Sequence, residues 1–266
     1  MPKVSVNIVT KNRADMLLQA IDSVLGQTFS DYELVIVNDG SVDDTSKVIN
    51  SFRGRLANLV YLENSKTLGV SAARQQALQA SSGQLVAPLD DDDLWIDPNK
   101  LVKQVEFLDD NPSVGIVGSS AEIYKVENGK SKTWIPAIDD IDIRKAILYK
   151  APFLNTASMF RKDLVLGIGG FNQGQKFSED YLMWLKLGQT SKFANLNFVG
   201  TKVRSQNSGL TRKNASAILE LAINYAFQFR SVYPNFVKAL LKLIPQYIFV
   251  LIFGINNWYK LKNLIS

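Results

Sequence analysis

The stretch Leu85-Val86-Ala87-Pro88-Leu89-Asp90-Asp91-Asp92-Asp93-Leu94-Trp95 joins an apolar run to four consecutive aspartates. The apolar half has the length and composition of a buried β-strand. Carboxylates packed this closely repel one another unless solvent, a cation or helix N-termini neutralise them. A buried strand that ends in this way indicates a hard divalent metal ion, and the alternative is a solvated acidic loop.

Histidine and cysteine are absent from all 266 residues. Mechanisms that need an imidazole, a thiolate or a disulfide are therefore excluded, and so are the usual nitrogen and sulfur zinc sites. Any metal site must consist of oxygen ligands, which favours Mg²⁺ or Mn²⁺. With 46% hydrophobic and 21% charged residues, the chain can bury a full core.

The first part of the chain alternates between strand and helix patterns. Apolar, β-branched runs predict strands at residues 4–9, 32–37, 60–62 and 84–89. Helices are predicted at 17–25, from the capping residues 43–45 to about 51, at 69–79, and from 97–98 onward. Four such repeats predict an α/β fold with a mostly parallel sheet that is covered on both faces.

Sheets of this kind bind ligands at the carboxyl ends of their strands. Thr10, Asp39 and Asp90 all fall at predicted strand ends.

From about residue 114 onward the alternation of strands and helices is less regular. It predicts a strand at 114–118, a hairpin of 123–126 with 133–135, a helix at 138–149, a helix after Ser178, and two strands at 192–198 and 200–204.

Five segments together resemble the family 2 glycosyltransferases, the large inverting group with the GT-A fold. They extend over roughly residues 3–212, in family order and at compatible spacing. The segments are residues 4–13, 35–41, 69–74 and 89–95, and the pairs Gly170-Phe171 and Glu179-Asp180. The resemblance implies a single GT-A domain. Its nucleotide-sugar-binding half is residues 1–118, its acceptor-binding and catalytic half is residues 119–212, and a helical segment follows at 213–266.

The resemblance also implies a nucleotide diphosphate sugar as donor, which we expect to be a UDP-hexose. Asp39 resembles the carboxylate that accepts the imide N–H of uracil, Thr10 borders the base, and Arg74 lies near the base and the diphosphate. Taken alone, these residues would be an Asx turn with Gly40, a strand-end hydroxyl and a solvated helix arginine. The full nucleotide-binding set is Thr10, Asn12, Arg13, Asp39, Arg74, Asp90 and Asp91.

The aspartate cluster takes the place of the family's D-x-D motif. The resemblance therefore assigns Mn²⁺ or Mg²⁺ to Asp92 and Asp90, with Asp92 as a direct ligand and Asp90 on the ribose or on metal-bound water. Such an ion neutralises charge on the leaving nucleotide. Asp180 resembles the second residue of the family's E-D motif and is the expected general base, with Glu179 orienting Asp180 or the acceptor. The alternative is that both residues only cap a helix.

Three positions depart from the family pattern. Lys11 stands where an aromatic residue is common, and Asn38 stands where an aspartate is common. The histidine that many members carry after the last strand is missing. Contacts with the metal or the phosphates from that side would then fall to Arg204 or Gln206.

The last fifth of the chain differs from the rest in charge and composition. Residues 211–266 contain seven Lys or Arg and one Glu, whereas residues 1–210 contain 23 Lys or Arg and 24 Asp or Glu. The apolar run 245–255 is too short to span a membrane, so we interpret this segment as peripheral on the inner membrane face. A helical pair packed on the domain or in a homodimer is the alternative.

The first residues lack a charged-then-apolar leader, which predicts a cytoplasmic protein.

The sequence thus predicts a metal-dependent inverting glycosyltransferase that moves a hexose from a UDP-sugar to a saccharide or lipid-linked saccharide in surface-glycan synthesis. A nucleotidyltransferase that makes nucleotide sugars would share the sheet and the acidic site. It should, however, carry a glycine-rich loop after the first strand, and residues 9–13 contain no glycine. A non-enzymatic basic module that binds membrane or nucleic acid would explain only the charge of the tail, and we expect no nucleic acid partner.

Overall fold

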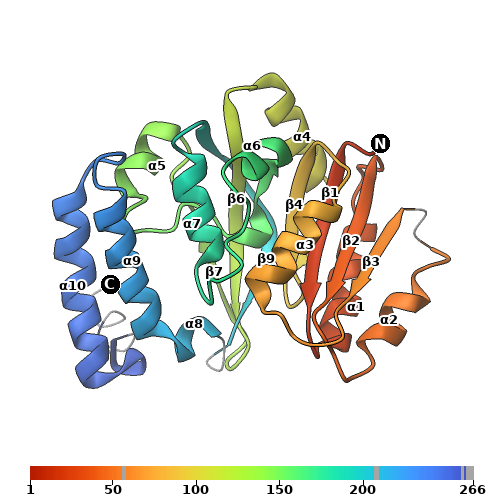
Figure 1. Cartoon of the computed structure of the whole chain (residues 1–266), viewed down its shortest axis with the longest axis horizontal. Helices are drawn as coiled ribbons and strands as arrows, with labels where there is room; N and C mark the ends of the chain where they lie inside the picture. Colours follow the sequence, from red (N-terminus) through yellow and green to blue (C-terminus); the bar gives the residue numbers. More distant parts are fainter. Residues whose placement is uncertain (56–57, 207–209, 259–260, 262–266) are drawn as a thin grey trace.

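The computed structural model of the chain describes residues 1–55, 58–206, 210–258 and 261. Its centre is a nine-stranded sheet in the order β3-β2-β1-β4-β8-β6-β9-β5, with β7 paired to β6 (Figure 1). The strands are β1 (Val4–Thr10), β2 (Tyr32–Asn38), β3 (Leu59–Glu63), β4 (Leu85–Asp90), β5 (Leu94–Trp95), β6 (Val114–Lys125), β7 (Lys130–Trp134), β8 (Met159–Arg161) and β9 (Lys192–Ser205). The helices are α1 (Ala14–Leu25), α2 (Thr45–Ser51), α3 (Val70–Ala80), α4 (Lys100–Asp110), α5 (Asp140–Ala146), the 3₁₀ turn η1 (Asn155–Ala157), α6 (Lys162–Gly167), α7 (Glu179–Leu187), α8 (Leu210–Lys213), α9 (Ala215–Gln228) and α10 (Phe236–Phe253).

The sheet is mostly parallel, as the alternation of strands and helices predicts. β1 pairs in parallel with β2 and β4, β2 with β3, and β6 with β9, whereas the short β8 runs antiparallel between β4 and β6. Alternate side chains of β2 point to opposite faces: Leu34 and Ile36 pack in one buried cluster with α1, and Val35 and Val37 pack against α3. The predicted α/β sheet with both faces covered is confirmed.

The prediction of two separate strands at 192–198 and 200–204 is wrong, because β9 is one strand. Its pairing with β6 shifts register between Ser119 and Ala121. A Cβ at Gly200 would lie 2.8 Å from the Ser119 hydroxyl, so a glycine is needed where the strands bulge. The strand predicted at 114–118 also continues to Lys125, and its end forms the predicted hairpin with β7. The predicted division at residue 118 falls inside β6 and stays a prediction.

The C-terminal helices pack on the domain through one face. Tyr225 and Leu243 lie in the same buried cluster as Trp184 of α7. Tyr233, between α9 and α10, donates from its hydroxyl to the carbonyl of Leu185 at 2.8 Å. The helical pair is therefore part of the domain's core, as one of the two alternatives for the tail expects.

α10 is longer than the apolar run at 245–255. The helix begins at Phe236, continues through Pro245 and has 18 residues, which by length and composition is enough to cross a membrane. The expectation that this segment is too short to span is therefore wrong. One face of α10 packs on the domain through Ala239, Leu243 and Val250, so α10 is a helix on the surface of the domain.

Lys100 is a fully buried amine between α4 and β5. Its Nζ donates to Oε1 of Gln104 at 2.8 Å and lies 4.1 Å from the ring centroid of Trp95. In the described part of the chain no carboxylate forms an ion pair with it. Burial lowers the pKa of Lys100 to about 7, so the neutral amine is favoured in the folded protein above that pH.

We predict that the free energy of unfolding increases with pH above 7. The unfolded chain keeps Lys100 protonated up to a pKa of about 10.4. Between these two values it binds more protons than the folded protein, so stability rises, by about 2 kcal/mol from pH 7 to pH 9. Urea unfolding at both pH values measures this difference. Lys100→Met should remove the slope, whereas Lys103→Met on the exposed side of α4 should keep it. A flat wild-type profile would contradict the prediction.

Candidate active site

Three predicted strand ends meet at one edge of the sheet. Thr10 lies opposite Asn38 in the β1–β2 pair, and Val9 lies opposite Asp90 in the β1–β4 pair. Asp39 follows directly after Asn38. The predicted nucleotide-binding residues of β1, β2 and β4 therefore come from neighbouring strands.

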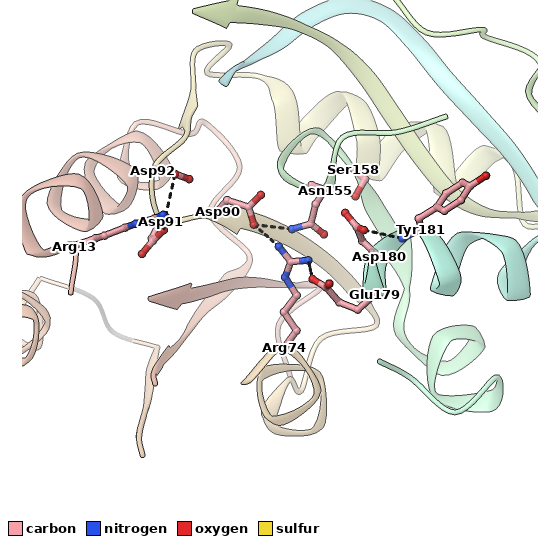
Figure 2. A network of polar contacts seen from close by, with 10 residues as sticks. All are labelled: Arg13, Arg74, Asp90, Asp91, Asp92, Asn155, Ser158, Glu179, Asp180 and Tyr181. Atoms are coloured by element: carbon pink, nitrogen blue, oxygen red, sulfur yellow. Dashed lines mark hydrogen bonds and ion pairs between the residues drawn. The ribbon is translucent and has the colours of Figure 1, made fainter. Parts of the chain in front are cut away.

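Arg74 of α3 joins the aspartate cluster to the start of α7. Its Nη2 donates to Oδ1 of Asp90 at 2.7 Å, and its Nη1 forms a short ion pair with Oε1 of Glu179 (Figure 2). Nδ2 of Asn155 donates to the same oxygen of Asp90 at 2.9 Å. Burial alone would lower the pKa of Arg74, but the carboxylates around it raise this pKa above its ordinary value. With its side chain only 14% exposed, Arg74 is not the solvated helix arginine of the alternative interpretation.

A tight loop before α7 holds Glu179 next to Arg74. Gly170 has a φ of +67°, and a Cβ there would lie 2.1 Å from Oε1 of Gln75. That oxygen accepts the N–H of Phe171 at 2.7 Å. The contact ties the loop to α3, the helix that carries Arg74. This position therefore requires glycine, which gives the Gly170-Phe171 pair a structural role in the site.

Arg13 neutralises the middle of the aspartate cluster. Its Nη1 lies 2.6 Å from Oδ1 of Asp91 and 2.9 Å from Oδ2 of Asp92. Burial raises the pKa of Asp91 to about 6, against the opposing effect of Arg13. Burial also raises the pKa of Asp92, again against Arg13. The cluster is therefore partly buried and paired, which excludes the alternative of a solvated acidic loop.

Arg204 approaches the cluster from β9. Its backbone N–H donates to Oδ1 of Asp93 at 2.9 Å, and its guanidinium donates to the carbonyl of Asp92 at 3.3 Å and to Oε1 of Gln19 at 2.5 Å. Burial and the neighbouring aspartates raise the pKa of Asp93 well above its ordinary value. Arg204 thus lies beside the cluster, and Gln206 lies one residue beyond β9. Contact of either residue with a phosphate or a metal ion stays a prediction.

Asp180 lines a cleft beside this cluster. Its Oδ1 accepts the N–H of Tyr181 at 2.7 Å. Burial and the adjacent Glu179 raise the pKa of Asp180 to about 7, against the effect of Arg74. The N-cap position of α7 belongs to Ser178, and neither acidic residue occupies it. A carboxylate with this pKa can accept a proton near neutral pH, which a capping role does not explain.

Two of the predicted nucleotide-binding residues make structural contacts of their own. The carboxylate of Asp39 accepts the N–H groups of Leu68 and Gly69 and an amide N–H of Asn64, each at 2.9 Å. These bonds fix the loop before α3. Asn12, with a φ of +53°, bonds to the loop that follows β2. Their contacts with a base or a ribose stay predictions, as does that of the buried Thr10.

The cleft has a volume of 440 Å³ and runs from the aspartates to the C-terminal helices. Asp90 and Asp93 line it near the sheet edge, and Asp180 lines it from α7. The rest of the wall is mostly aromatic and aliphatic. It includes Tyr149, Phe153, Leu154, Tyr181, Trp184, Val203, Ile218, Ala222 and Leu243.

Asn155 and the part of the cleft wall that α9 and α10 form could not be predicted from the sequence. Asn155 holds Asp90 from η1, yet it lies in a short polar stretch of the sequence that no motif or spacing marks. Ile218, Ala222 and Leu243 belong to α9 and α10, far along the chain from the other residues of the site. Only the packing of the tail on the domain brings them together.

Asp90 and Asp92 offer the oxygen ligands that Mg²⁺ and Mn²⁺ prefer. The side chains are 34% and 26% exposed, and their ion pairs with Arg74 and Arg13 each use one carboxylate oxygen. Among the described residues, no group of three His, Cys, Asp or Glu side chains is gathered as a metal cage. The pair fits an ion that takes one or two carboxylates and completes its shell with water and substrate phosphates.

Comparison with known proteins places the chain among glycosyltransferases. The family model for glycosyl transferase family 2 matches residues 5–169. The amylovoran biosynthesis glycosyltransferase AmsE of Erwinia amylovora is 29% identical over 211 residues, which are 79% of this chain and 78% of AmsE. The UDP-Glc:alpha-D-GlcNAc-diphosphoundecaprenol beta-1,3-glucosyltransferase WfaP of Escherichia coli is 28% identical over 206 residues, 77% of this chain and 78% of WfaP.

Solved structures share the fold. S. aureus TarS 1-349 in complex with UDP-GlcNAc has a TM-score of 0.69 at 19% identity, over 98% of this chain and 76% of that chain. The mannosyltransferase PcManGT from Pyrobaculum calidifontis, in complex with GDP-Man and Mn²⁺, has a TM-score of 0.67 at 20% identity, over 85% of this chain and 64% of that chain. The fold is therefore the GT-A fold that the sequence resemblance implies.

We predict that Arg74→Met lowers the free energy of unfolding by about 3 to 5 kcal/mol, because it leaves Asp90 and Glu179 without their shared cation. Urea unfolding measures the loss. The matched control is Arg13→Met, whose side chain is 40% exposed and should therefore cost less. Adding Glu179→Gln to Arg74→Met should recover part of the stability. A larger loss for Arg13→Met than for Arg74→Met would contradict the prediction.

Proposed function

Because the chain belongs to glycosyl transferase family 2, we propose that it transfers a hexose, with inversion, from a UDP-hexose to a lipid-linked saccharide in surface-glycan synthesis. The observation that carries this proposal is Asp180, a carboxylate with a raised pKa in a cleft that begins at the aspartate cluster. Family membership supports neither of the two alternatives, the nucleotidyltransferase and the non-enzymatic basic module.

The proposed mechanism gives each carboxylate its own role. Direct displacement at the anomeric carbon requires the acceptor hydroxyl to lose a proton, and Asp180 accepts it. Glu179, held by Arg74, keeps the start of α7 in place. A divalent ion on Asp92 and Asp90 would neutralise charge on the leaving nucleotide diphosphate. The Mn²⁺ in the PcManGT complex supports this assignment.

Two observations support a UDP-hexose as the donor: the nucleotide sugars named for relatives of the chain, and the residues at the carboxyl edge of the sheet. The name of WfaP specifies UDP-Glc, and TarS was solved with UDP-GlcNAc. In this chain Thr10, Asp39 and Arg74 lie together at the carboxyl edge of the sheet, at or beside the ends of β1, β2 and β4. We propose that they surround the uracil and the diphosphate.

The acceptor assignment rests on the cleft. Its wall beyond Asp180 is mostly aromatic and aliphatic and ends at α9 and α10. Aromatic side chains suit sugar rings, and an apolar exit suits a lipid-linked molecule. The acceptor in the name of WfaP, GlcNAc-diphosphoundecaprenol, is of this class.

α10 also presents an apolar stripe to the outside, which we propose lies on an anionic membrane surface. The stripe follows a spacing of three and four residues and so forms one helix face. Its members are 38% to 72% exposed and are Val237, Leu241, Ile244, Ile248 and Leu251. Residues 221–266 contain no Asp or Glu and five Lys or Arg. This charge favours lipid headgroups over a second copy of the same basic surface.

We predict that Asp180→Asn lowers kcat by about 10² to 10⁴-fold, because the amide cannot accept the acceptor proton. Wild-type kcat should rise with pH through about 7, as Asp180 loses its proton, and the variant should lack this rise. The assay is UDP release from a panel of UDP-hexoses with Mn²⁺ and a prenyl-diphosphate-linked GlcNAc.

The matched control for that assay is Asp44→Asn, an exposed carboxylate just before α2 that pairs with Lys47 and does not line the cleft. It should leave kcat and its pH dependence unchanged. Product with retained anomeric configuration, or wild-type kcat in Asp180→Asn, would contradict the mechanism. A preference for GDP- or dTDP-sugars would overturn the UDP assignment alone.

We predict that the full chain floats with phosphatidylglycerol vesicles and that the triple variant Val237→Ser, Leu241→Ser, Ile248→Ser loses most of this binding, since each serine removes apolar area from the stripe. Flotation in a density gradient measures it, and added salt should weaken it. Val42→Ser, at an exposed position outside the tail, is the control. A stable dimer in light scattering that the triple variant disrupts, without vesicle binding by the wild type, would assign the stripe to a second copy.

A further inference from the structure

The cleft has a basic end that the proposed transfer step does not use. Asp180 lines the cleft from α7, and Tyr149 and Lys150, which follow α5, line it together with Leu243 of α10. Two more lysines, from α10, approach Tyr149. Nζ of Lys242 lies 4.3 Å from its ring centroid, and Nζ of Lys238 lies 5.6 Å from it.

These lysines are not neutralised by the protein. Among the described residues, none of Lys150, Lys238 and Lys242 forms an ion pair with a carboxylate. The acidic residues of the neighbouring α5 are already paired: Asp140 with Arg144 at 2.8 Å and Asp142 with Lys145 at 2.9 Å. The cation–π contacts with Tyr149 hold the ammonium groups in place without cancelling their charge. The surroundings of Tyr149, a residue of the cleft wall, therefore hold ammonium groups whose charge can attract an anion.

The position of the lysines on α10 links the cleft to the membrane-facing stripe. Lys238 and Lys242 are four residues apart and so share one flank of the helix. The buried residues Ala239 and Leu243 lie on one side of that flank, and the exposed stripe that begins at Val237 lies on the other. With the stripe on a membrane, the ammonium groups would lie at the depth of the headgroups and face the mouth of the cleft.

We propose that Tyr149, Lys150, Lys238 and Lys242 form a subsite for the diphosphate of a prenyl-diphosphate-linked saccharide acceptor. The sugar end of this acceptor extends along the aromatic wall toward Asp180, and its prenyl chain leaves along the α10 stripe. Three ammonium groups are enough to neutralise the two negative charges of a diphosphate that links a prenyl chain to a sugar, and the apolar stripe beside them matches the prenyl chain. The inference rests on the proposed function and names the substrate class of the same cleft.

The test is binding of farnesyl diphosphate by calorimetry, without donor and with EDTA, so that the donor-side metal site takes no part. Wild-type protein should bind farnesyl diphosphate more tightly than inorganic pyrophosphate or farnesol. The double variant Lys238→Ala, Lys242→Ala should weaken the binding by at least about ten-fold. Lys47→Ala, Arg53→Ala is the matched control, because it removes two positive charges within and just after α2, one of them over the ring of Tyr61. Helix α2 lies at the end of the molecule opposite α10 (Figure 1). This control should bind as the wild type does.

Each other outcome overturns the proposal in a distinct way. Equal affinity for pyrophosphate and farnesyl diphosphate would assign the lysines to a free phosphate. Loss of phosphatidylglycerol vesicle binding in the double variant, with farnesyl diphosphate binding intact, would make them headgroup contacts only. If the wild-type protein releases UDP from its donor but does not bind farnesyl diphosphate, the proposed subsite is wrong and the proposed function is unaffected. If the protein does not transfer sugar at all, the proposed function is wrong. Thermal melting checks the fold of each variant, and Lys238→Arg, Lys242→Arg should retain binding because it keeps both charges.

Discussion

One buried cation, Arg74, fixes the geometry of the site. Its guanidinium bonds at the same time to Asp90 at the end of β4 and to Glu179 at the start of α7. A planar fork suits two carboxylates that approach from different directions, and a lysine could not hold both. Buried ion pairs add little net stability, but they favour one arrangement strongly, because separating them leaves uncompensated charge. The aspartate cluster and the first turn of α7 are therefore held in one relative position.

This arrangement separates two adjacent carboxylates by role. Glu179 is held in the ion pair with Arg74, while the neighbouring Asp180 is buried next to that negative charge and its pKa rises to about 7. Surroundings that raise the pKa of one carboxylate toward neutral pH are typical of sites with a dedicated base. On the other side, Arg13 pairs with Asp91 and Asp92 and so offsets the repulsion between these adjacent carboxylates.

The position of Thr10, Asp39 and Asp90 at one edge of the sheet could be predicted from the sequence, because each of them ends or follows a strand. An apolar run that ends in Asp39 or Asp90 defines both the strand and the position of the carboxylate at the sheet edge. The acceptor side could not be predicted in the same way. η1, β8 and α6 are too short to produce a periodic pattern, so Asn155 went unnoticed. In the sequence nothing distinguishes Lys100 from a surface lysine, and only the packing of α4 on the sheet shows that it is buried.

For the C-terminal helices, the sequence and the structure lead to different interpretations. Their charge and apolar runs are visible in the sequence and suggest an appendage, yet Tyr225 and Leu243 belong to the same core as Trp184. A close-packed core transmits displacement between its parts. Trp184 and Leu243 also line the cleft, so the core that holds α10 on the domain forms part of the cleft wall as well. A displacement of α10 would therefore change the shape of this wall, which makes the C-terminal helices part of the architecture of the cleft.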